Sequence, residues 1–264
     1  MTEAKGPTPE EQAAALKVAT DKQNKIMEEA VKAILKHSVV ASCKTAGAVP
    51  ARGSAGAYQV GGHFDKSLLP KLKAFAVTEF PPDAKLVETA LRDMPMGMCS
   101  GMCDEFIALL GEACESSALA CEPIFLTAVS GLPVADAKAI FEGPPEAASA
   151  YLEDKCRKQI CDQCLPVVTK CLDGSKAVAA WTTVSEAFNK LPLVDPLAFT
   201  LEEWVMTQSV MGLFALIQQQ EAAIRSNPAS TGDAICQDVF GNAALMKCKD
   251  AYTFVDEYEK GKKK

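Results

Sequence analysis

The feature that most constrains the fold is a series of long segments with helical periodicity, separated by glycine and proline corners. The clearest segment begins at Thr200, where Thr200 and Glu203 have the spacing of a capping box, and it continues to Asn227-Pro228. Within this segment apolar residues recur every three or four positions, as the buried face of a helix requires. No run in the chain sustains the apolar-polar alternation of a strand. The pattern predicts an all-α fold.

Composition divides the chain into four parts. Helical signals from Pro9 to about His37 predict an N-terminal helical extension over residues 1–41. Residues 42–62 are rich in glycine and alanine and predict a loop. Residues 63–242 predict a compact multi-helix domain, and residues 243–264 predict a C-terminal helix followed by a basic tail.

Glycines and prolines mark the ends of the expected helices. We expect helices over residues 9–37, 68–77, 84–94, 98–130, 133–141, 144–172, 177–191, 201–226 and 243–258. Pro123 and Pro166 fall inside two of these helices and predict bends. The large apolar side chains that we expect to contribute most to the core are Phe125, Phe141, Trp204 and Phe214.

The charge of the chain excludes several classes of partner. A formal net charge of −7 and an isoelectric point near 5.1 argue against nucleic acid or an anionic membrane, because both require a basic face. Lys260 and Lys262–Lys264 form the one basic run, which we interpret as a solvated tail. The sequence therefore predicts a protein partner and no nucleic acid.

The N-terminal residues and the apolar stretches predict a cytosolic protein. The start of the chain lacks the basic residues and apolar core of a secretory signal, and its acidic residues are not typical of a transit peptide. The longest apolar stretch, residues 205–217, is shorter than the ~20 apolar residues of a spanning helix. We expect no insertion into a membrane.

The cysteines are numerous enough to suggest a metal or a disulfide. Four of the eleven have the C-x4-C-x2-C spacing of a plant-type iron–sulfur protein followed by one more cysteine: Cys156, Cys161, Cys164 and Cys171. A second set recurs at helical steps and consists of Cys99, Cys103, Cys114 and Cys121. Both sets lie in expected helices, and cysteine is among the most buried residue types. We therefore favour a cysteine-lined helix interface of free thiols, with a metal or cluster at the first set as the alternative.

No catalytic constellation is evident. His37, near an expected helix end, and His63, beside a glycine pair, belong to neither a zinc-protease motif nor a nucleophile elbow. A cysteine–histidine pair stays open, because such partners need not be close in sequence. The adjacent carboxylates Asp104 and Glu105 point in different directions from a helix. The sequence predicts no catalytic residue, no cofactor and no enzyme.

The order of the corners and core residues resembles that of the domain of unknown function 4197 family. The marks of this resemblance are Pro123 with Phe125, residues 135–143, Tyr151-Leu152, Leu165-Pro166, Asp195-Pro196, Gly212-Leu213-Phe214 and residues 224–228. The best match covers about residues 86–241 and implies an all-helical fold, without a known reaction, ligand or catalytic residue. Bacterial members usually carry an export signal. The N-terminal residues here lack its features, so we expect a cytosolic form. Within the matched block we interpret Arg225 and Asp136 as helix-end charges.

The favoured function is a non-catalytic structural or interaction module that docks on a larger intracellular assembly through its terminal helices. A cytoskeletal or ciliary structure, such as the microtubule lattice of an axoneme, is one candidate host. Two alternatives stay open. The first is a carrier for a small apolar ligand, lined by Met94, Met96, Met98 and Met102. The second is a redox sensor or enzyme that uses one exposed cysteine.

Overall fold

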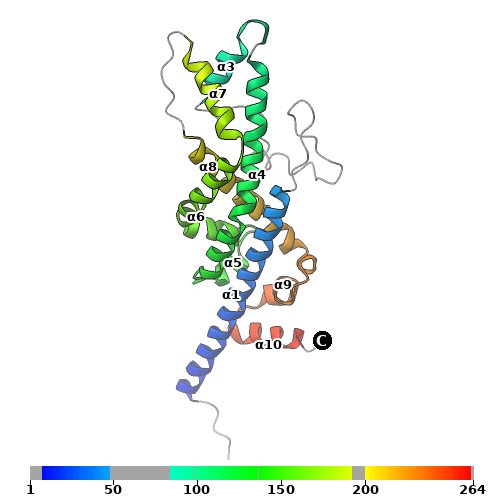
Figure 1. The fold of residues 1–264 in the computed structure, drawn as a ribbon. Coiled ribbons are helices and arrows are strands. Elements are labelled where there is room, and N and C mark those ends of the chain that lie inside the picture. Colours follow the sequence, from blue (N-terminus) through cyan, green and yellow to red (C-terminus); the bar gives the residue numbers. More distant parts are fainter. Residues whose placement is uncertain (1–7, 48–83, 98, 136, 192–199, 263–264) are drawn as a thin grey trace, which may run out of the picture. The chain divides into compact units, whose positions relative to one another are not determined.

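The computed structural model describes residues 8–47, 84–97, 99–135, 137–191 and 200–262, and in this part of the chain the protein consists of helices and short connections (Figure 1). These residues contain α-helices and short 3-10 turns and no strand, which confirms the predicted all-α class. Among these helices, none combines the length and apolar character needed to cross a membrane.

Four long helices and five shorter ones make up the described α-helical structure. The long helices are α1 (Pro9–Gly47), α4 (Ser100–Gly131), α6 (Ala147–Gly174) and α8 (Leu201–Ser226). The shorter ones are α3 (Lys85–Arg92), α5 (Ala137–Glu142), α7 (Ala177–Asn189), α9 (Ala234–Phe240) and α10 (Ala251–Gly261). Short 3-10 turns are η3 (Pro95–Gly97), η4 (Pro228–Thr231) and η5 (Leu245–Lys247).

Most of the expected helices are confirmed, and two of them contain the prolines that the sequence places inside them. Pro123 lies inside α4 and Pro166 inside α6. Helix α8 begins and ends where the sequence predicts, and Thr200 Oγ1 donates to the Glu203 carboxylate over 2.9 Å at its start. The helix expected over residues 133–141 begins later, at Ala137 of α5, and residues 132–135 are not helical.

The predicted end of the first helix is wrong. Helix α1 continues to Gly47, so residues 42–47 are not a loop. Ser42, Cys43 and Ala46 are buried, and tertiary contact therefore stabilises turns that the small side chains alone did not predict. Residues 48–62 of the predicted loop and the expected helix over 68–77 lie outside the described residues.

The predicted C-terminal helix is also partly wrong. Instead of one helix over residues 243–258, the chain forms η5 and then α10. Asp250 starts α10 by accepting a hydrogen bond from the Thr253 backbone N–H over 3.0 Å. Helix α9 was not expected, because it is too short to show a helical period.

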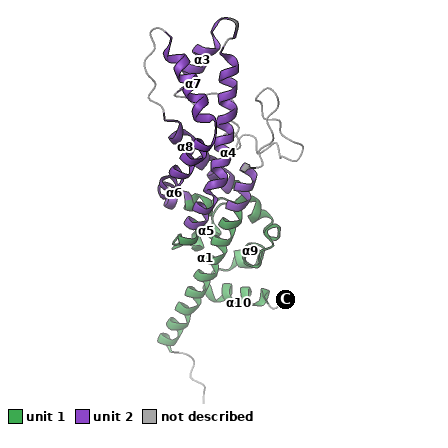
Figure 2. Cartoon of the chain, viewed as in Figure 1, with its two compact units in different colours: residues 1–38, 129–152, 218–264 green, residues 39–128, 153–217 purple. Residues whose placement is uncertain are grey.

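The chain forms two compact units (Figure 2). Unit 1 consists of residues 1–38, 129–152 and 218–264, and unit 2 consists of residues 39–128 and 153–217. Helices α1, α4, α6 and α8 contribute residues to both units.

Aromatic rings form the centre of unit 1. The Phe141 ring, on α5, is 1% exposed. Its centroid lies 5.6 Å from that of Phe240 on α9 and 6.1 Å from that of Phe254 on α10. Such pairs add to the free energy gained from burial alone. Phe141 therefore joins three short helices that would be marginal by themselves.

A buried ion pair on α8 closes the corner between α5 and α6. Glu221 is fully buried and accepts hydrogen bonds from the backbone N–H groups of Ala148 over 3.0 Å and Ser149 over 2.7 Å, and also from the Ser149 hydroxyl. Arg225 Nε donates to Glu221 over 2.9 Å.

The remaining donors of Arg225 reach the end of α5. Its two Nη atoms donate to the carbonyl oxygens of Ile140 over 3.0 Å and Phe141 over 3.1 Å. One pair thus satisfies the first N–H groups of α6 and the last carbonyls of α5. The prediction that Arg225 is a helix-end charge is confirmed, while Asp136 lies outside the described residues.

Unit 2 has its own aromatic contacts. Phe125 on α4 and Phe214 on α8 pack edge to face with centroids 5.2 Å apart, and Phe106 on α4 lies 5.2 Å from Trp181 on α7. Helix α3 packs against α7. The predicted core roles of Phe125, Phe141 and Phe214 are confirmed, whereas Trp204 is only half-buried.

Candidate functional site

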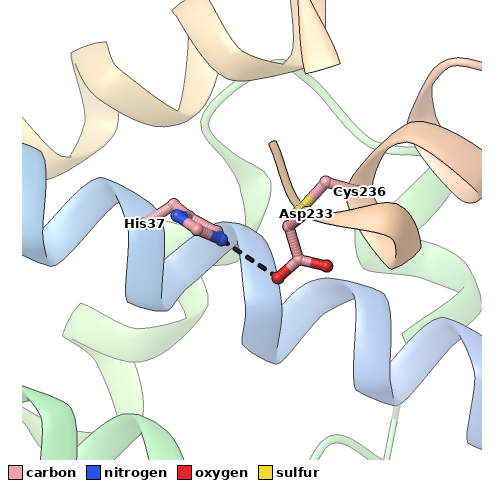
Figure 3. A group of neighbouring side chains, drawn as sticks. All are labelled: His37, Asp233 and Cys236. Carbon is pink, nitrogen blue, oxygen red and sulfur yellow. Dashed lines mark hydrogen bonds and ion pairs between the residues drawn. The ribbon is translucent and has the colours of Figure 1, made fainter. Parts of the chain in front are cut away.

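Three side chains with metal-ligand chemistry meet in unit 1. His37 comes from α1, Asp233 precedes α9, and Cys236 lies in the first turn of α9. Their ligand atoms all lie within 4.8 Å of one another, and across the described ranges no other three His, Cys, Asp or Glu residues do so. Figure 3 shows the His37 ring and the Asp233 carboxylate facing each other, with the Cys236 sulfur beside them.

A glycine and a helix cap position two of the three residues. Gly232 ends η4 with φ +68°, a conformation that other residues adopt only with strain. Asp233 follows as the N-cap of α9, and its Oδ1 accepts a hydrogen bond from the Ile235 N–H over 3.0 Å. The cap leaves Oδ2 free to face His37 Nε2, which lies 3.0 Å away.

The electrostatics of the two acidic groups differ. The hydrogen bond from His37 is the main cause that lowers the pKa of Asp233, burial opposes it, and the Ile235 N–H lowers it further. Burial raises the pKa of Cys236 to about 11, with a further contribution from the Asp233 charge. Thr231 forms a side-chain hydrogen bond with Cys236 that acts in the opposite direction.

Solvent reaches the site from one side. A hollow of about 250 Å³ is lined by Glu29, Lys32, Ala33, Lys36, His37 and Asp233. The side chains of His37 and Asp233 are 35% and 33% exposed, whereas Cys236 is fully buried. The thiol is therefore protected, while small solutes can approach the imidazole and the carboxylate.

The arrangement brings a cysteine and a histidine together, a type of pair that the sequence left open without indicating which residues would form it. A cysteine nucleophile needs an accessible thiolate, and the burial and raised pKa of Cys236 oppose one. The same nitrogen, oxygen and sulfur atoms are all accepted as ligands by zinc. The prediction that His37 lies near a helix end is wrong, because α1 continues beyond it to Gly47. His63 lies outside the described residues.

No motif in the sequence points directly to Asp233 or Cys236. Thr231, Gly232 and Asp233 could have indicated a helix cap, since a glycine followed by a capping aspartate often starts a helix. No local pattern could have joined this cap to His37, 196 positions earlier.

One cysteine from each of the two predicted sets meets the other in unit 2. Cys164 of α6 forms a hydrogen bond with Cys121 of α4, and Cys43 of α1 lies close enough to interact with both electrostatically. Seven of the eleven cysteines are buried, as expected for a cysteine-lined interface. Within the candidate iron–sulfur set, Cys156 and Cys164 are buried and Cys161 and Cys171 half-buried, and no three of these sulfurs lie within 4.8 Å of one another. A metal at this set stays an untested alternative.

These thiols should make the protein sensitive to alkali. Burial raises the pKa of Cys43 to about 12, with help from the nearby Glu122, and the hydrogen bond with Cys121 raises the pKa of Cys164. An unfolded cysteine has a pKa of about 8.5. Because the folded values are higher, the stabilisation is complete below about pH 8.5 and is lost as the pH rises toward about 12.

The rate of thiol labelling also reports the raised pKa of Cys43. At pH 8 the thiolate fraction of Cys43 is about 1,000-fold lower than in the unfolded chain, so labelling of Cys43 should be slower by at least that factor. Mass spectrometry of alkylated protein measures it, with the half-buried Cys171 as the comparison. Equal labelling of Cys43 in native and urea-unfolded protein would contradict the prediction.

Of the four methionines considered for a ligand cavity, Met102 lines a shallow hollow. Met102 lines a space of about 220 Å³ together with residues of α4 and α7, and two of these, Glu105 and Lys176, are charged. Met94 is half-buried, and the side chains of Met96 and Met98 lie outside the described residues. The hollow is smaller than the ~300–1,000 Å³ of typical ligand pockets.

The fold and site define an all-α protein of two helical units with a cap-positioned His-Asp-Cys group. The chain belongs to the family described as "Protein of unknown function (DUF4197)", whose model matches residues 73–241. Neither the comparison with curated proteins nor that with solved structures returned a match. Asp233 and Cys236 lie within the family region, whereas α1, with His37, and α10 lie outside it.

Proposed function

We propose that the chain is a non-catalytic interaction module, which binds a protein partner of a larger intracellular assembly through the first turns of α1. One observation carries this proposal. Each side chain from Thr8 to Val18 is exposed, and the first buried residue of the helix is Ala19. In Figure 1 this dark blue start of α1 extends past α10. The helix thus begins well outside the core of unit 1.

The exposed turns are preformed. The Thr8 N–H donates to the Glu11 carboxylate over 2.7 Å, and the Glu11 N–H donates to Thr8 Oγ1 over 3.3 Å, which completes a capping box. An isolated helix of this length would be marginal, since about 12–15 residues are needed in water. The cap and the packed turns from Ala19 onward hold it instead. A preformed helix loses little conformational freedom when a partner binds.

Apolar side chains on these turns offer the contact area. Leu16 is 48% exposed and Val18 is 67% exposed. Tyr252 of α10 is 47% exposed, and its hydroxyl donates to the Gln12 carbonyl over 3.5 Å. Because residues two positions apart lie about 200° apart around a helix, Leu16 and Val18 face opposite sides. A groove that wraps around the helix would cover both.

The lysines at the end of α10 add little support for a partner. Lys260 forms ion pairs with Asp256 over 2.6 Å and Glu257 over 2.9 Å, and the Lys262 ammonium lies 4.7 Å from the centroid of the Tyr258 ring. These lysines are engaged within α10, so we assign the anchor to α1. A cytoskeletal or ciliary lattice in the cytoplasm, microtubules included, stays one candidate host within the proposal.

Charge substitutions in the exposed turns should abolish binding. In native extracts, cross-linking through Lys17 and Lys22 should identify a neighbour of the wild-type protein. The double variant Leu16→Glu with Val18→Glu should bind at least ~30-fold more weakly, because each buried anchor contributes about 1–2 kcal/mol. Its stability should stay within about 0.5 kcal/mol of wild type, because both residues are exposed.

Leu86→Glu is the matched control, since Leu86 is 67% exposed on α3 in unit 2. It should leave binding unchanged. A partner held equally by wild type and the double variant would refute the anchor on α1. A protein that forms no cross-link and remains monomeric in extracts would refute the interaction module itself.

A further inference from the structure

We propose that His37, Asp233 and Cys236 bind a divalent transition-metal ion, with Zn²⁺ as the cation that their chemistry fits best. This site is independent of the docking function proposed for α1. It assigns a ligand to three side chains of unit 1 whose donor atoms converge from separate elements.

The donor set selects the class of metal. The group offers one imidazole nitrogen, one carboxylate oxygen and one thiolate sulfur. Calcium and magnesium prefer oxygen ligands alone, so a sulfur and an imidazole argue against them. Zinc accepts all three donor types, and cobalt and nickel bind similar sets. Zinc is therefore the expected ion and cobalt a useful spectroscopic substitute.

The spacing of the donors suits a tetrahedral ion. Zinc bonds of about 2.0–2.3 Å place neighbouring ligand atoms on the order of 3.3–3.7 Å apart. His37 Nε2 lies 3.0 Å from Asp233 Oδ2, and every pair in the group lies within 4.8 Å. Small rotations of the three side chains would bring each distance into the required range.

Outer contacts orient the ligands before a metal arrives. The Ile235 N–H holds Asp233 Oδ1, so Oδ2 is directed at the shared space. Thr231 forms a hydrogen bond with the Cys236 side chain. Hydrogen bonds from neighbouring groups to the ligand side chains are typical of metal sites, and they fix the direction of the donor atoms.

The hollow beside the site supplies an entry path and a fourth ligand. His37 and Asp233 both line the hollow of about 250 Å³. Three protein ligands and one water complete a tetrahedral shell. On binding, the Cys236 S–H bond breaks, a sulfur–zinc bond forms, and the proton passes to the buffer. The proton that His37 Nε2 donates to Asp233 in the metal-free protein passes through solvent to Nδ1, so that the Nε2 lone pair can bind the ion.

Metal titration of chelator-treated, full-length protein tests the proposal. We expect one Zn²⁺ per chain, a rise in melting temperature on binding, and a thiolate-to-cobalt charge-transfer band when Co²⁺ is used instead. His37→Ala and Cys236→Ser should each weaken Zn²⁺ binding at least ~100-fold, because loss of a ligand exceeds the ~10–100-fold effect of losing an outer contact. Cys236→Ser should also remove the charge-transfer band.

Two further variants keep the test decisive. Cys248→Ser is the matched control, since Cys248 is a half-buried cysteine of unit 1 outside the group, and it should bind Zn²⁺ like wild type. Asp233→Asn keeps an oxygen for the helix cap and removes the charged ligand, so it serves if Cys236→Ser fails to fold. Absence of saturable binding at one ion per chain overturns the proposal. Binding that survives His37→Ala and Asp233→Asn, or that is lost in Cys164→Ser, also overturns it.

Discussion

Replacing Glu221 with glutamine is expected to lower the free energy of unfolding by about 3–5 kcal/mol, the usual result of breaking a buried ion pair. The variant leaves Arg225, whose side chain is 11% exposed, without its 2.9 Å carboxylate partner. It also replaces an acceptor of the Ala148 and Ser149 N–H groups with an amide that accepts through one oxygen only. Urea unfolding followed by circular dichroism measures the change.

An exposed pair of the same type provides the control. Glu153 and Arg157 on α6 have the same four-residue spacing and a 3.1 Å contact, but their side chains are 26% and 47% exposed. Glu153→Gln should therefore cost less than about 1 kcal/mol. Equal effects of Glu221→Gln and Glu153→Gln would contradict the role of the buried pair.

Truncation of Phe141 should be comparably damaging. Phe141→Ala removes a 1% exposed ring that packs on Phe240 and Phe254, and such truncations cost about 3–5 kcal/mol. The loss should fall first on α9 and α10, which are short and depend on this contact. Amide hydrogen exchange should therefore accelerate in both helices before the rest of unit 1 opens.

The control for Phe141 is a truncation at the surface. Leu86→Ala removes a side chain that is 67% exposed and should stay within about 0.5 kcal/mol of wild type. Phe141→Leu should lose less than Phe141→Ala, since it keeps most of the buried volume. Unchanged hydrogen exchange in α9 and α10 of Phe141→Ala would show that other residues hold these helices.

Helix boundaries followed the sequence where a cap or a proline sets them. Helix α8 is the best case, because Thr200, Glu203 and Asn227-Pro228 act within a few residues of the ends that they fix. The end of α1 and the existence of α9 were missed. Residues 42–47 are helical in a buried setting, and α9 spans too few residues to show periodicity.

The candidate site was much less accessible to sequence reasoning. The sequence places His37 near an expected helix end and indicates no partner for it. The meeting of Cys121 with Cys164 likewise joins two sets that the sequence showed separately. Cysteine spacing within one helix predicted a shared face and could not predict which helix would cover it.

The sequence by itself determined the helical class, the family and the helix ends that carry caps, because these depend on contacts within a few residues along the chain. Only the tertiary structure decided that Glu221 and Arg225 close the corner between α5 and α6, and that His37 meets Asp233 and Cys236. Those contacts join residues that are tens to hundreds of positions apart. They depend on how helices pack, and periodicity specifies which face is buried but not what lies against it.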